Sequence, residues 1–397
     1  MNDRRRLYLA ALVRALATGL IGVLLGVYLT QIGLDPRTMG FVVGAGLAGA
    51  ATGTSIVTFL GHRLGHRRAL IASALLAAAG GVALALSSHP WALGAAAFVG
   101  MVNGMGRDRG AAFVVEQAVL PTTVADAGRT MAFARYNIVQ DAGHALGGLM
   151  GALPSIFEGT GLASADGAFR LSVLVYAALV LLPVAAYVGL SSVVDGPAPT
   201  PGVRVSPESR RVLWRISSLF AIDAVGGGFL TTALVAFFFY ERFSVGLETI
   251  GPLFFVARLA NALSHLGAAW LARRIGLVRT MVFTHIPSSL LLVTVAFAPT
   301  FPIAAALFIL REGLVEMDVP TRQSYVMAVV RPEERAVASG VTHLVRMAAW
   351  AIAPLFAGML MEDVALMVPL LVGAGLKIGY DLLLWRAFRD AKPPEER

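Results

Sequence analysis

Charged side chains interrupt an apolar run in the second half of the chain. The segment Arg311–Gln323 reads REGLVEMDVPTRQ and lies inside an apolar stretch, residues 301–330, that is long enough to cross a bilayer. A charge at the middle of a membrane helix costs roughly 2.5–3.5 kcal/mol. We therefore expect these side chains to face other helices or a water-filled path: Arg311, Glu312, Glu316, Asp318 and Arg322.

The spacing of these residues suggests two kinds of chemistry. Arg311, Asp318 and Arg322 share one helix face, and Asp318 can pair with Arg322 one turn away. Arginines bind anionic groups through a fork of donors. Glu312 and Glu316 lie one turn apart and repel each other unless one is protonated, which suits proton transfer. The rival interpretation is an ion-pair network that fixes this helix to its neighbours.

The first half of the chain contains a related segment. Residues 101–117 read MVNGMGRDRGAAFVVEQ, and a shift of 206 positions places Gln117 on Gln323 and Glu116 on Arg322. Glycines make its backbone pliable, and an internal set of salt bridges is the structural alternative to a binding role. The chain is thus predicted to be two related halves, and this segment adds four candidates: Arg107, Asp108, Arg109 and Glu116.

Further candidates lie in other predicted helices. Arg14 and Asp223 occupy corresponding depths in the two halves, and Asp223 is our first candidate for a proton-carrying carboxylate. A static Arg14–Asp223 ion pair is the alternative. Arg258 is followed by Asn261 and His265 at helical spacing. The histidines are scattered without metal-ligand spacing, so we expect hydrogen-bonded packing residues and no metal site.

The composition places the chain in the membrane. Of 397 residues, 57% are hydrophobic and only 14% are charged, against about 25% in soluble domains. Continuous apolar runs without alternation exclude a β-barrel. The net charge of +8 comes with no basic patch interleaved with aromatic residues, so no nucleic-acid partner is expected. Cysteine is absent, which excludes disulfides and thiolate metal sites, and no cleavable signal peptide is evident.

The apolar lengths predict an all-α polytopic membrane protein with about 12 transmembrane helices. We expect a six-helix bundle in residues 1–190, a proline-rich linker in 191–211 and a second bundle in 212–397. The predicted helices are Leu7–Gln31, Phe41–Leu60, Ala69–Leu86, Ala92–Leu120, Arg129–Phe157, Arg170–Leu190, Leu213–Tyr240, Ile250–Leu271, Thr280–Ala298, Phe301–Val330, Ala336–Met361 and Ala365–Trp385.

The distribution of loop arginines predicts the topology. Most arginines outside the apolar runs lie in one set of alternate segments, and only Arg37, Arg170 and Arg242 lie in the other. Positively charged loops stay in the cytoplasm, so both termini should be cytoplasmic. We expect a monomer in a bilayer, in a bacterial cytoplasmic membrane.

This organisation resembles the major facilitator superfamily. GHRLGHRR (Gly61–Arg68) is similar to that family's loop motif G-x-x-x-D-R-x-G-R-R, with ARRIGLVR (Ala272–Arg279) at the matching place. His62 and Arg273 replace the motif's aspartate, and GHALGGLMG (Gly143–Gly151) is a loose version of a glycine-rich exporter motif or a close-packing surface. The resemblance implies that the first, fourth, seventh and tenth helices line a central cavity, where most of the candidate charges fall.

We therefore interpret the chain as a secondary transporter working by alternating access, not an enzyme, and without a cofactor. Candidate arginines slightly outnumber the acids, which favours a small substrate with an anionic group; carboxylates would carry protons. Substrate-binding candidates are Arg14, Arg107, Arg109, Arg258, Arg311 and Arg322. Proton-coupling candidates are Asp223, Asp318, Glu316, Asp108 and Glu116. The alternatives are proton-driven efflux of drugs or amphiphiles, transition-metal transport and a transport-inactive sensor or scaffold.

Overall fold

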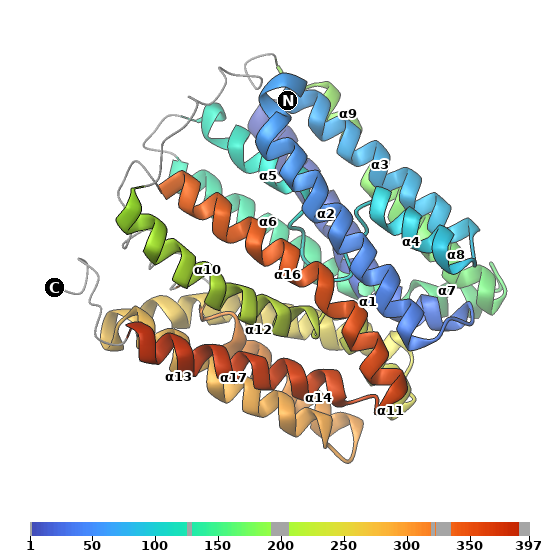
Figure 1. Cartoon of the computed structure of the whole chain (residues 1–397). Coiled ribbons are helices and arrows are strands. Elements are labelled where there is room, and N and C mark those ends of the chain that lie inside the picture. The colour runs from blue at the N-terminus through green and yellow to red at the C-terminus, as the bar shows by residue number, and fades with distance from the viewer. Residues whose placement is uncertain (1, 125–128, 192–205, 319–321, 323–334, 389–397) are drawn as a thin grey trace. The chain divides into compact units, whose positions relative to one another are not determined.

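A computed structural model describes residues 2–124, 129–191, 206–318, 322 and 335–388 (Figure 1). Within these ranges the chain forms helices, turns and loops but no strand. This confirms the predicted all-α fold. Pro320, Gln323, Arg331 and most of the linker lie outside the described residues.

The first half of the chain forms long helices separated by shorter ones. Asp35 caps the second helix: its carboxylate accepts hydrogen bonds from the Thr38 backbone N–H (2.7 Å) and hydroxyl (3.1 Å). Partial burial raises the pKa of Asp35, but these hydrogen bonds outweigh it and hold the pKa below its ordinary value. The elements are α1 (Asp3–Gln31), α2 (Pro36–Leu64), α3 (His66–Leu86), α4 (Pro90–Val99), α5 (Ala111–Val119), η1 (Leu120–Thr123), α6 (Arg129–Leu149), η3 (Met150–Ala152), α7 (Leu153–Gly159), α8 (Ala165–Leu181) and α9 (Pro183–Val188).

In the described part of the second half, seven helices are present. Its first helix starts at Ser206, whose hydroxyl accepts a hydrogen bond from the Ser209 backbone N–H, with a proline at the first helical position. The described helices are α10 (Pro207–Gly228), α11 (Thr232–Phe243), α12 (Leu247–Ile275), α13 (Leu277–Ala296), α14 (Phe301–Val315), α16 (Arg335–Asp363) and α17 (Val368–Phe388).

Among the described residues, eight helical segments are long and apolar enough to cross a membrane. They correspond to the first, second, third, sixth, seventh, ninth, eleventh and twelfth predicted spans. Among the remaining four, the fourth and tenth predicted spans are described only as helices shorter than 18 residues, namely α4, α5 and α14.

Five of the predicted helices are not continuous. Three of them, over residues 129–157, 170–190 and 213–240, divide into α6, η3 and α7, into α8 and α9, and into α10 and α11. The other two carry the charged segments. The helix predicted over residues 92–120 breaks at Gly100–Gly110, which separates α4 from α5. The helix predicted over residues 301–330 ends as α14 at Val315, with a turn at Glu316 and Met317. Glycines, Asn103 and consecutive charges explain the first break, because they favour turns and disfavour a helix in an apolar setting.

Close approach of backbones joins α1 and α6. A Cβ added at Gly147 would lie 2.2 Å from the Leu16 carbonyl oxygen, and one at Gly143 would lie 2.6 Å from the Ala15 Cβ. Only glycine fits such contacts, which are typical of helix packing in membranes. The glycine-rich motif of this segment therefore serves close packing.

The chain separates into two compact units. Unit 1 comprises residues 1–200, 231–255 and 354–363; unit 2 comprises residues 201–230, 256–353 and 364–397. Unit 1 thus contains two segments from the second half of the sequence, whereas unit 2 is made of second-half segments alone. The predicted division into residues 1–190, 191–211 and 212–397 stays a prediction.

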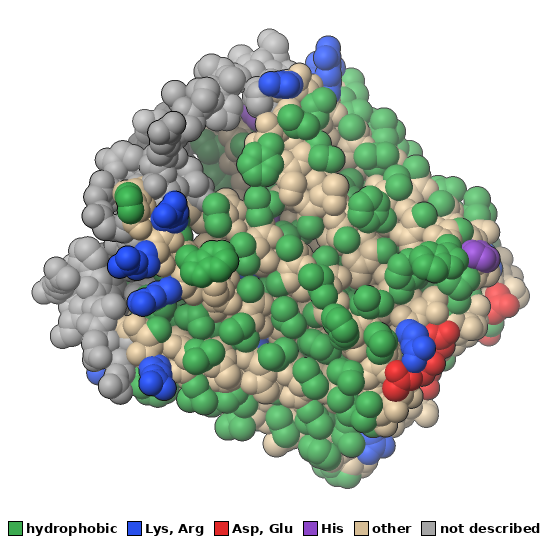
Figure 2. All heavy atoms as spheres, viewed as in Figure 1, with side chains coloured by type: hydrophobic (Ala, Val, Ile, Leu, Met, Phe, Trp, Pro, Cys, Tyr) green, Lys and Arg blue, Asp and Glu red, His purple; other side chains and the backbone are tan. Residues whose placement is uncertain are grey.

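Exposed surfaces of the helices are largely apolar. Figure 2 shows apolar side chains covering the middle parts of the helices on one face, while arginine, lysine and acidic side chains gather near helix ends. Large side chains on this and other faces include Phe59 (64% exposed) and Trp91 (72% exposed). A surface of this kind suits hydrocarbon rather than water.

Candidate functional site

In unit 1, Arg14 of α1 is at the centre of a buried network. Its Nη1 and Nη2 donate to the two oxygens of Glu116 on α5, at 2.7 and 2.8 Å, and its Nε donates to Asp108. A guanidinium that meets a carboxylate with two parallel hydrogen bonds is held in direction as well as position. The Glu116 side chain is fully buried, so this ion pair belongs to the interior of unit 1.

Two tyrosines complete the coordination of Glu116. Tyr136 of α6 and Tyr187 of α9 each donate a hydroxyl hydrogen bond to this carboxylate at 2.6 Å. The Tyr187 hydroxyl also accepts from Arg14 Nη1 at 2.7 Å. Every donor and acceptor in this centre is therefore engaged, and Arg14 offers no unused N–H directed toward a ligand.

The break between α4 and α5 is held in place from several helices. The Asp108 backbone N–H donates to His144 Nε2 of α6 at 2.9 Å, and the Gly104 carbonyl accepts from the Ala233 backbone N–H of α11 at 3.0 Å. The Asn103 side-chain oxygen accepts from the Met105 backbone N–H at 2.8 Å. Non-helical backbone at membrane depth needs such partners, because no water is available in hydrocarbon.

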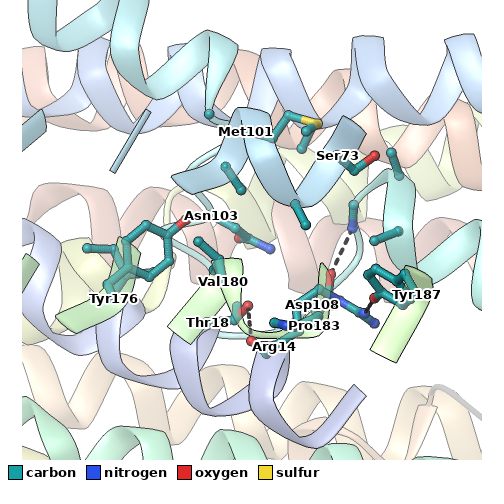
Figure 3. A pocket seen from close by; sticks show the side chains of 18 residues that line it. Arg14, Thr18, Ser73, Met101, Asn103, Asp108, Tyr176, Val180, Pro183 and Tyr187 are labelled. Atoms are coloured by element: carbon teal, nitrogen blue, oxygen red, sulfur yellow. Dashed lines mark hydrogen bonds and ion pairs between the residues drawn. The ribbon is translucent and has the colours of Figure 1, made fainter. Parts of the chain in front are cut away.

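A cavity adjoins this broken segment in unit 1. Figure 3 shows Arg14, Asp108 and Tyr187 at one end and Met101, Asn103 and Tyr176 farther along its wall. The lining comes from α1, α2, α3, α5, α8, α9 and the break itself. Discontinuous helices in transporters commonly mark sites where substrates or ions bind.

In unit 2, three cations converge on one carboxylate. Asp223 of α10 is 2% exposed. Its Oδ1 accepts from Lys377 Nζ of α17 at 2.8 Å, and its Oδ2 accepts from Arg346 of α16 at 2.8 Å and from Arg322 at 3.2 Å. The Asp223 carboxylate thus binds three cationic side chains, Lys377, Arg346 and Arg322, which come from different segments of unit 2.

The two arginines have additional support. Arg322 also pairs with Asp318 at 2.5 Å, as its one-turn spacing predicts. Arg346 lies over the Trp350 ring, 4.8 Å from its centroid, and Arg322 lies 5.3 Å from the centroid of the Phe220 ring. Aromatic faces attract cations, so these guanidinium groups keep favourable contacts that do not depend on Asp223.

The network of unit 2 extends beyond Lys377 to a histidine and a second aspartate. Lys377 Nζ lies 3.3 Å from His285 Nε2 of α13. The other ring nitrogen, Nδ1, lies 3.0 and 3.1 Å from the carboxylate oxygens of Asp381. Asp381 is fully buried. The contacts therefore form a buried series from Asp223 through Lys377 and His285 to Asp381.

Corresponding helices supply the two networks, with different charges. In predicted helix order, the first, fourth, fifth and sixth spans of unit 1 contribute Arg14, Glu116, Tyr136 and Tyr187. The seventh, tenth, eleventh and twelfth contribute Asp223, Arg322, Arg346 and Lys377 to unit 2. The Arg14–Glu116 pair of unit 1 corresponds to the Asp223–Arg322 pair of unit 2, with the charges reversed. The neutral Tyr136 and Tyr187 correspond to the cationic Arg346 and Lys377. Unit 1 thus encloses a satisfied carboxylate, whereas unit 2 gathers cations around one.

Other candidate residues occupy separate surroundings. Arg311 pairs with its neighbour Glu312 rather than with Asp318, and Asn261 Nδ2 donates to Glu312 Oε2 at 2.9 Å. Arg258 contacts the Asn261 side chain at 3.5 Å. Arg107 and Arg109 are half-buried in the broken segment, and Glu316 is half-buried in the turn after α14.

The alternative of a static Arg14–Asp223 ion pair stays a prediction, because the two residues belong to different units. Each of these residues takes oppositely charged partners within its own unit: Asp108 and Glu116 for Arg14, and three cations for Asp223. The expectation that most of the candidate charges fall in a central cavity also stays a prediction.

Four residues of the unit 2 network were absent from the sequence-based candidates: Arg346, Lys377, Asp381 and His285. Lys377 and Asp381 lie one turn apart within an apolar span, which is itself a signal of a functional polar site. His285 follows an apolar run and has no such spacing to other candidates. Its importance comes from the packing of α13 against α17 and could not be derived from its own helix.

Comparisons with known proteins agree with this architecture. The family model described as Major Facilitator Superfamily matches residues 7–394. A Saccharomyces cerevisiae protein described as uncharacterized membrane protein YJR124C is 24% identical over 417 positions, which cover 96% of this chain and 93% of that protein.

Solved structures share the fold at low identity. A mutant of the nucleoside transporter NupG aligns with a TM-score of 0.78 and 14% identity, covering 98% of this chain and 100% of that one. The xylose transporter XylE from E. coli, in a partially occluded inward-open conformation, aligns with a TM-score of 0.73 and 12% identity, covering 99% of each chain. Together with the match over residues 7–394, the eight apolar helical segments lead to one conclusion: this chain is a multi-pass integral membrane protein of the Major Facilitator Superfamily.

Proposed function

We propose that this protein is a secondary transporter, moving a small solute with an anionic group by alternating access, with protons as the coupling ion. Membership of the family supports a transporter rather than an enzyme. The observation that carries the substrate class is the convergence of Lys377, Arg346 and Arg322 on Asp223. The proposal places the protein in a bacterial cytoplasmic membrane, as a monomer with cytoplasmic termini.

The physical basis is competition between two anions. Three cations in a site of low dielectric need negative charge nearby, and Asp223 supplies it in the substrate-free protein. A carboxylate or phosphate of a substrate can replace it, because arginine binds either group through two parallel hydrogen bonds. The aromatic contacts of Arg322 and Arg346 keep both guanidinium groups in place during this exchange.

Proton coupling follows from the same competition. When a substrate anion takes the cations, the Asp223 carboxylate loses their stabilisation and becomes a better proton acceptor. Proton binding to Asp223 and anion binding to the cations then favour each other. Asp318, which shares Arg322 with Asp223, and Glu316 beyond it are candidates for accepting the proton next.

The remaining candidates have secondary parts in this proposal. Arg14, Asp108 and Glu116 position the broken segment of unit 1, because all their strong donors and acceptors are paired with one another. Arg107, Arg109, Arg258 and Arg311 would attract the anion along its route rather than hold it.

The test is uptake by purified protein in proteoliposomes, with an inward proton gradient and a panel of small organic anions, neutral solutes and organic cations. We expect accumulation of an anion. Asp223→Asn should abolish accumulation against a gradient yet keep counterflow exchange, because exchange needs no net proton movement.

The matched control is Asp166→Asn, the same chemical change at an exposed carboxylate on α8, which should transport normally. Two results would contradict the proposal. One is transport restricted to neutral or cationic solutes. The other is gradient-driven accumulation by the Asp223→Asn protein, which would make Asp223 a structural residue.

A further inference from the structure

His285 lies between a lysine and a carboxylate in the interior of unit 2. It is 1% exposed, with Lys377 Nζ 3.3 Å from Nε2 and the Asp381 carboxylate 3.0–3.1 Å from Nδ1. The ring therefore has a polar partner at each nitrogen. Such a histidine is held in a fixed orientation and can change its charge near neutral pH.

Only one hydrogen can lie between His285 Nε2 and Lys377 Nζ. A lysine ammonium only donates, so Nε2 must carry a lone pair when Lys377 is charged, and the ring proton then lies on Nδ1 and is donated to Asp381. A second proton, on Nε2, would place two cations 3.3 Å apart. Protonation of His285 is therefore incompatible with Lys377 staying where it is.

The same two nitrogens face one oxygen of Asp223. Lys377 Nζ lies 2.8 Å from Asp223 Oδ1, and His285 Nε2 lies 3.9 Å from the same atom. A protonated His285 is thus already near enough to pair with this carboxylate, while the neutral ring is not a donor toward it. Asp223 Oδ1 can therefore pair either with the Lys377 ammonium or with a protonated His285.

We propose that His285 is a proton-binding site whose protonated ring takes over Asp223 Oδ1 and releases Lys377 to bind the anionic group of the substrate. The proton comes from water and adds to Nε2, and no other bond changes. Asp381 stabilises the resulting imidazolium through Nδ1–H. The release of Lys377 toward an anion rests on the proposed function, whereas the proton site does not.

The charged and titratable groups around His285 agree with this assignment. On α17, Lys377, Tyr380 and Asp381 face it, the Tyr380 ring centroid being 6.1 Å from that of His285. From α10 it meets Asp223, through which Arg346 of α16 and Arg322 are linked to it. On α14, which also packs against α13, Arg311 and Glu312 pair with each other. Two carboxylates thus contact or approach the ring, and Lys377 is the cation that must leave.

The test of the proton site needs neither substrate nor transport. Nitrogen NMR of protein labelled with ¹⁵N-histidine in detergent distinguishes Nδ1–H, Nε2–H and the doubly protonated ring. The His285 signal is identified by its loss in His285→Gln. We expect the Nδ1–H form at high pH and the doubly protonated form at low pH.

Lys377→Met sharpens this test. Removing the competing cation should move the His285 transition to higher pH by at least tenfold in proton concentration. A His285 that stays in one form across the range, or an Nε2–H tautomer at high pH, would overturn the proposal. So would a transition that Lys377→Met leaves unmoved.

Transport by the variants separates this inference from the proposed function. With an anionic substrate in hand, His285→Gln should flatten the pH dependence of uptake, while His89→Gln, at an exposed histidine, should keep it. If His285 changes its protonation as expected in a protein that moves no anion, the proton site is supported and the proposed function is wrong. If His285 does not change its protonation in a protein that transports an anion and depends on Asp223, the proposed function is supported and the proton site is wrong.

Discussion

Glu116 is a buried and fully coordinated charge in unit 1. Its two oxygens accept four hydrogen bonds, two from Arg14 and one each from Tyr136 and Tyr187. An ionised carboxylate buried at 0% exposure is tolerated only with such partners. This centre acts as a fixed point that ties α1, α5, α6 and α9 together.

We predict that Glu116→Gln destabilises the protein by about 3–5 kcal/mol, because it leaves part of the buried Arg14 charge uncompensated. Thermal unfolding in detergent measures this. Tyr187→Phe should cost less, because Arg14 and Glu116 keep their hydrogen bonds to each other when the Tyr187 hydroxyl is lost. The triple variant Arg14→Met, Asp108→Asn, Glu116→Leu should recover much of the loss, since it removes all three charges of the centre together. A triple variant less stable than Glu116→Gln would contradict this account.

For single residues, the sequence identified which buried charges matter but not which residues they contact. Arg14, Glu116, Asp223 and Arg322 were recognised because a charge within an apolar span needs an explanation. The one-turn pair of Asp318 and Arg322 was predicted correctly, since both residues belong to one stretch of chain. Contacts between helices were not predictable, because helical spacing does not reveal which faces meet.

Among the elements, the broken fourth helix was the main surprise. A continuous apolar run predicted a helix over residues 92–120, and the break at Gly100–Gly110 became visible only in three dimensions. The signals were present: four glycines, Asn103 and three consecutive charges. Their weight could not be judged from the sequence, because the break is stabilised by His144, Thr232 and Ala233, which lie far away in the chain.

The α1–α6 contact gives a prediction at the level of helices. Gly147→Val would place a Cβ 2.2 Å from the Leu16 carbonyl oxygen and force the two helices apart, at a cost of about 1–3 kcal/mol. Gly375→Val on α17 is the matched control, because a Cβ added at Gly375 would have nothing within 4 Å. The thermal unfolding midpoints of the two purified variants test this, and we expect a lower midpoint for Gly147→Val than for Gly375→Val. Equal midpoints would show that α1 and α6 do not depend on this approach.

For the molecule as a whole, ion pairs at helix ends carry information about alternating access. Within unit 1, Arg37 near the start of α2 pairs with Asp363 at the end of α16 at 2.7 Å, and its backbone N–H donates to Glu362. Both side chains of the ion pair are about half exposed. Contacts joining the first and second halves of the sequence at one end must open if the transporter exposes its site there.

Because the chain has no cysteine, this can be tested directly. We predict that Arg37→Cys, Asp363→Cys, joined by a short reducible bifunctional reagent, stops transport, and that reduction restores it. The two single-cysteine proteins treated in the same way are the controls. Transport that continues after complete cross-linking would show that α2 and α16 stay together throughout the cycle.

The fold class and family resemblance were predictable at this scale because hydrophobic length, loop arginines and a repeated segment each report on the whole chain. The grouping of two second-half segments with unit 1 was not predictable, since residues 231–255 and 354–363 give no local sign of this association.

The Arg14 network also has a consequence for biogenesis. Arg14 enters the membrane with α1, but the carboxylates that neutralise it lie 94 and 102 residues farther along the chain. At a synthesis rate of about 5–20 residues per second, roughly 5–20 s pass before Glu116 has been made. The first helix therefore has to wait beside the insertion machinery, or with its arginine drawn toward lipid headgroups, until the fourth span arrives to receive it.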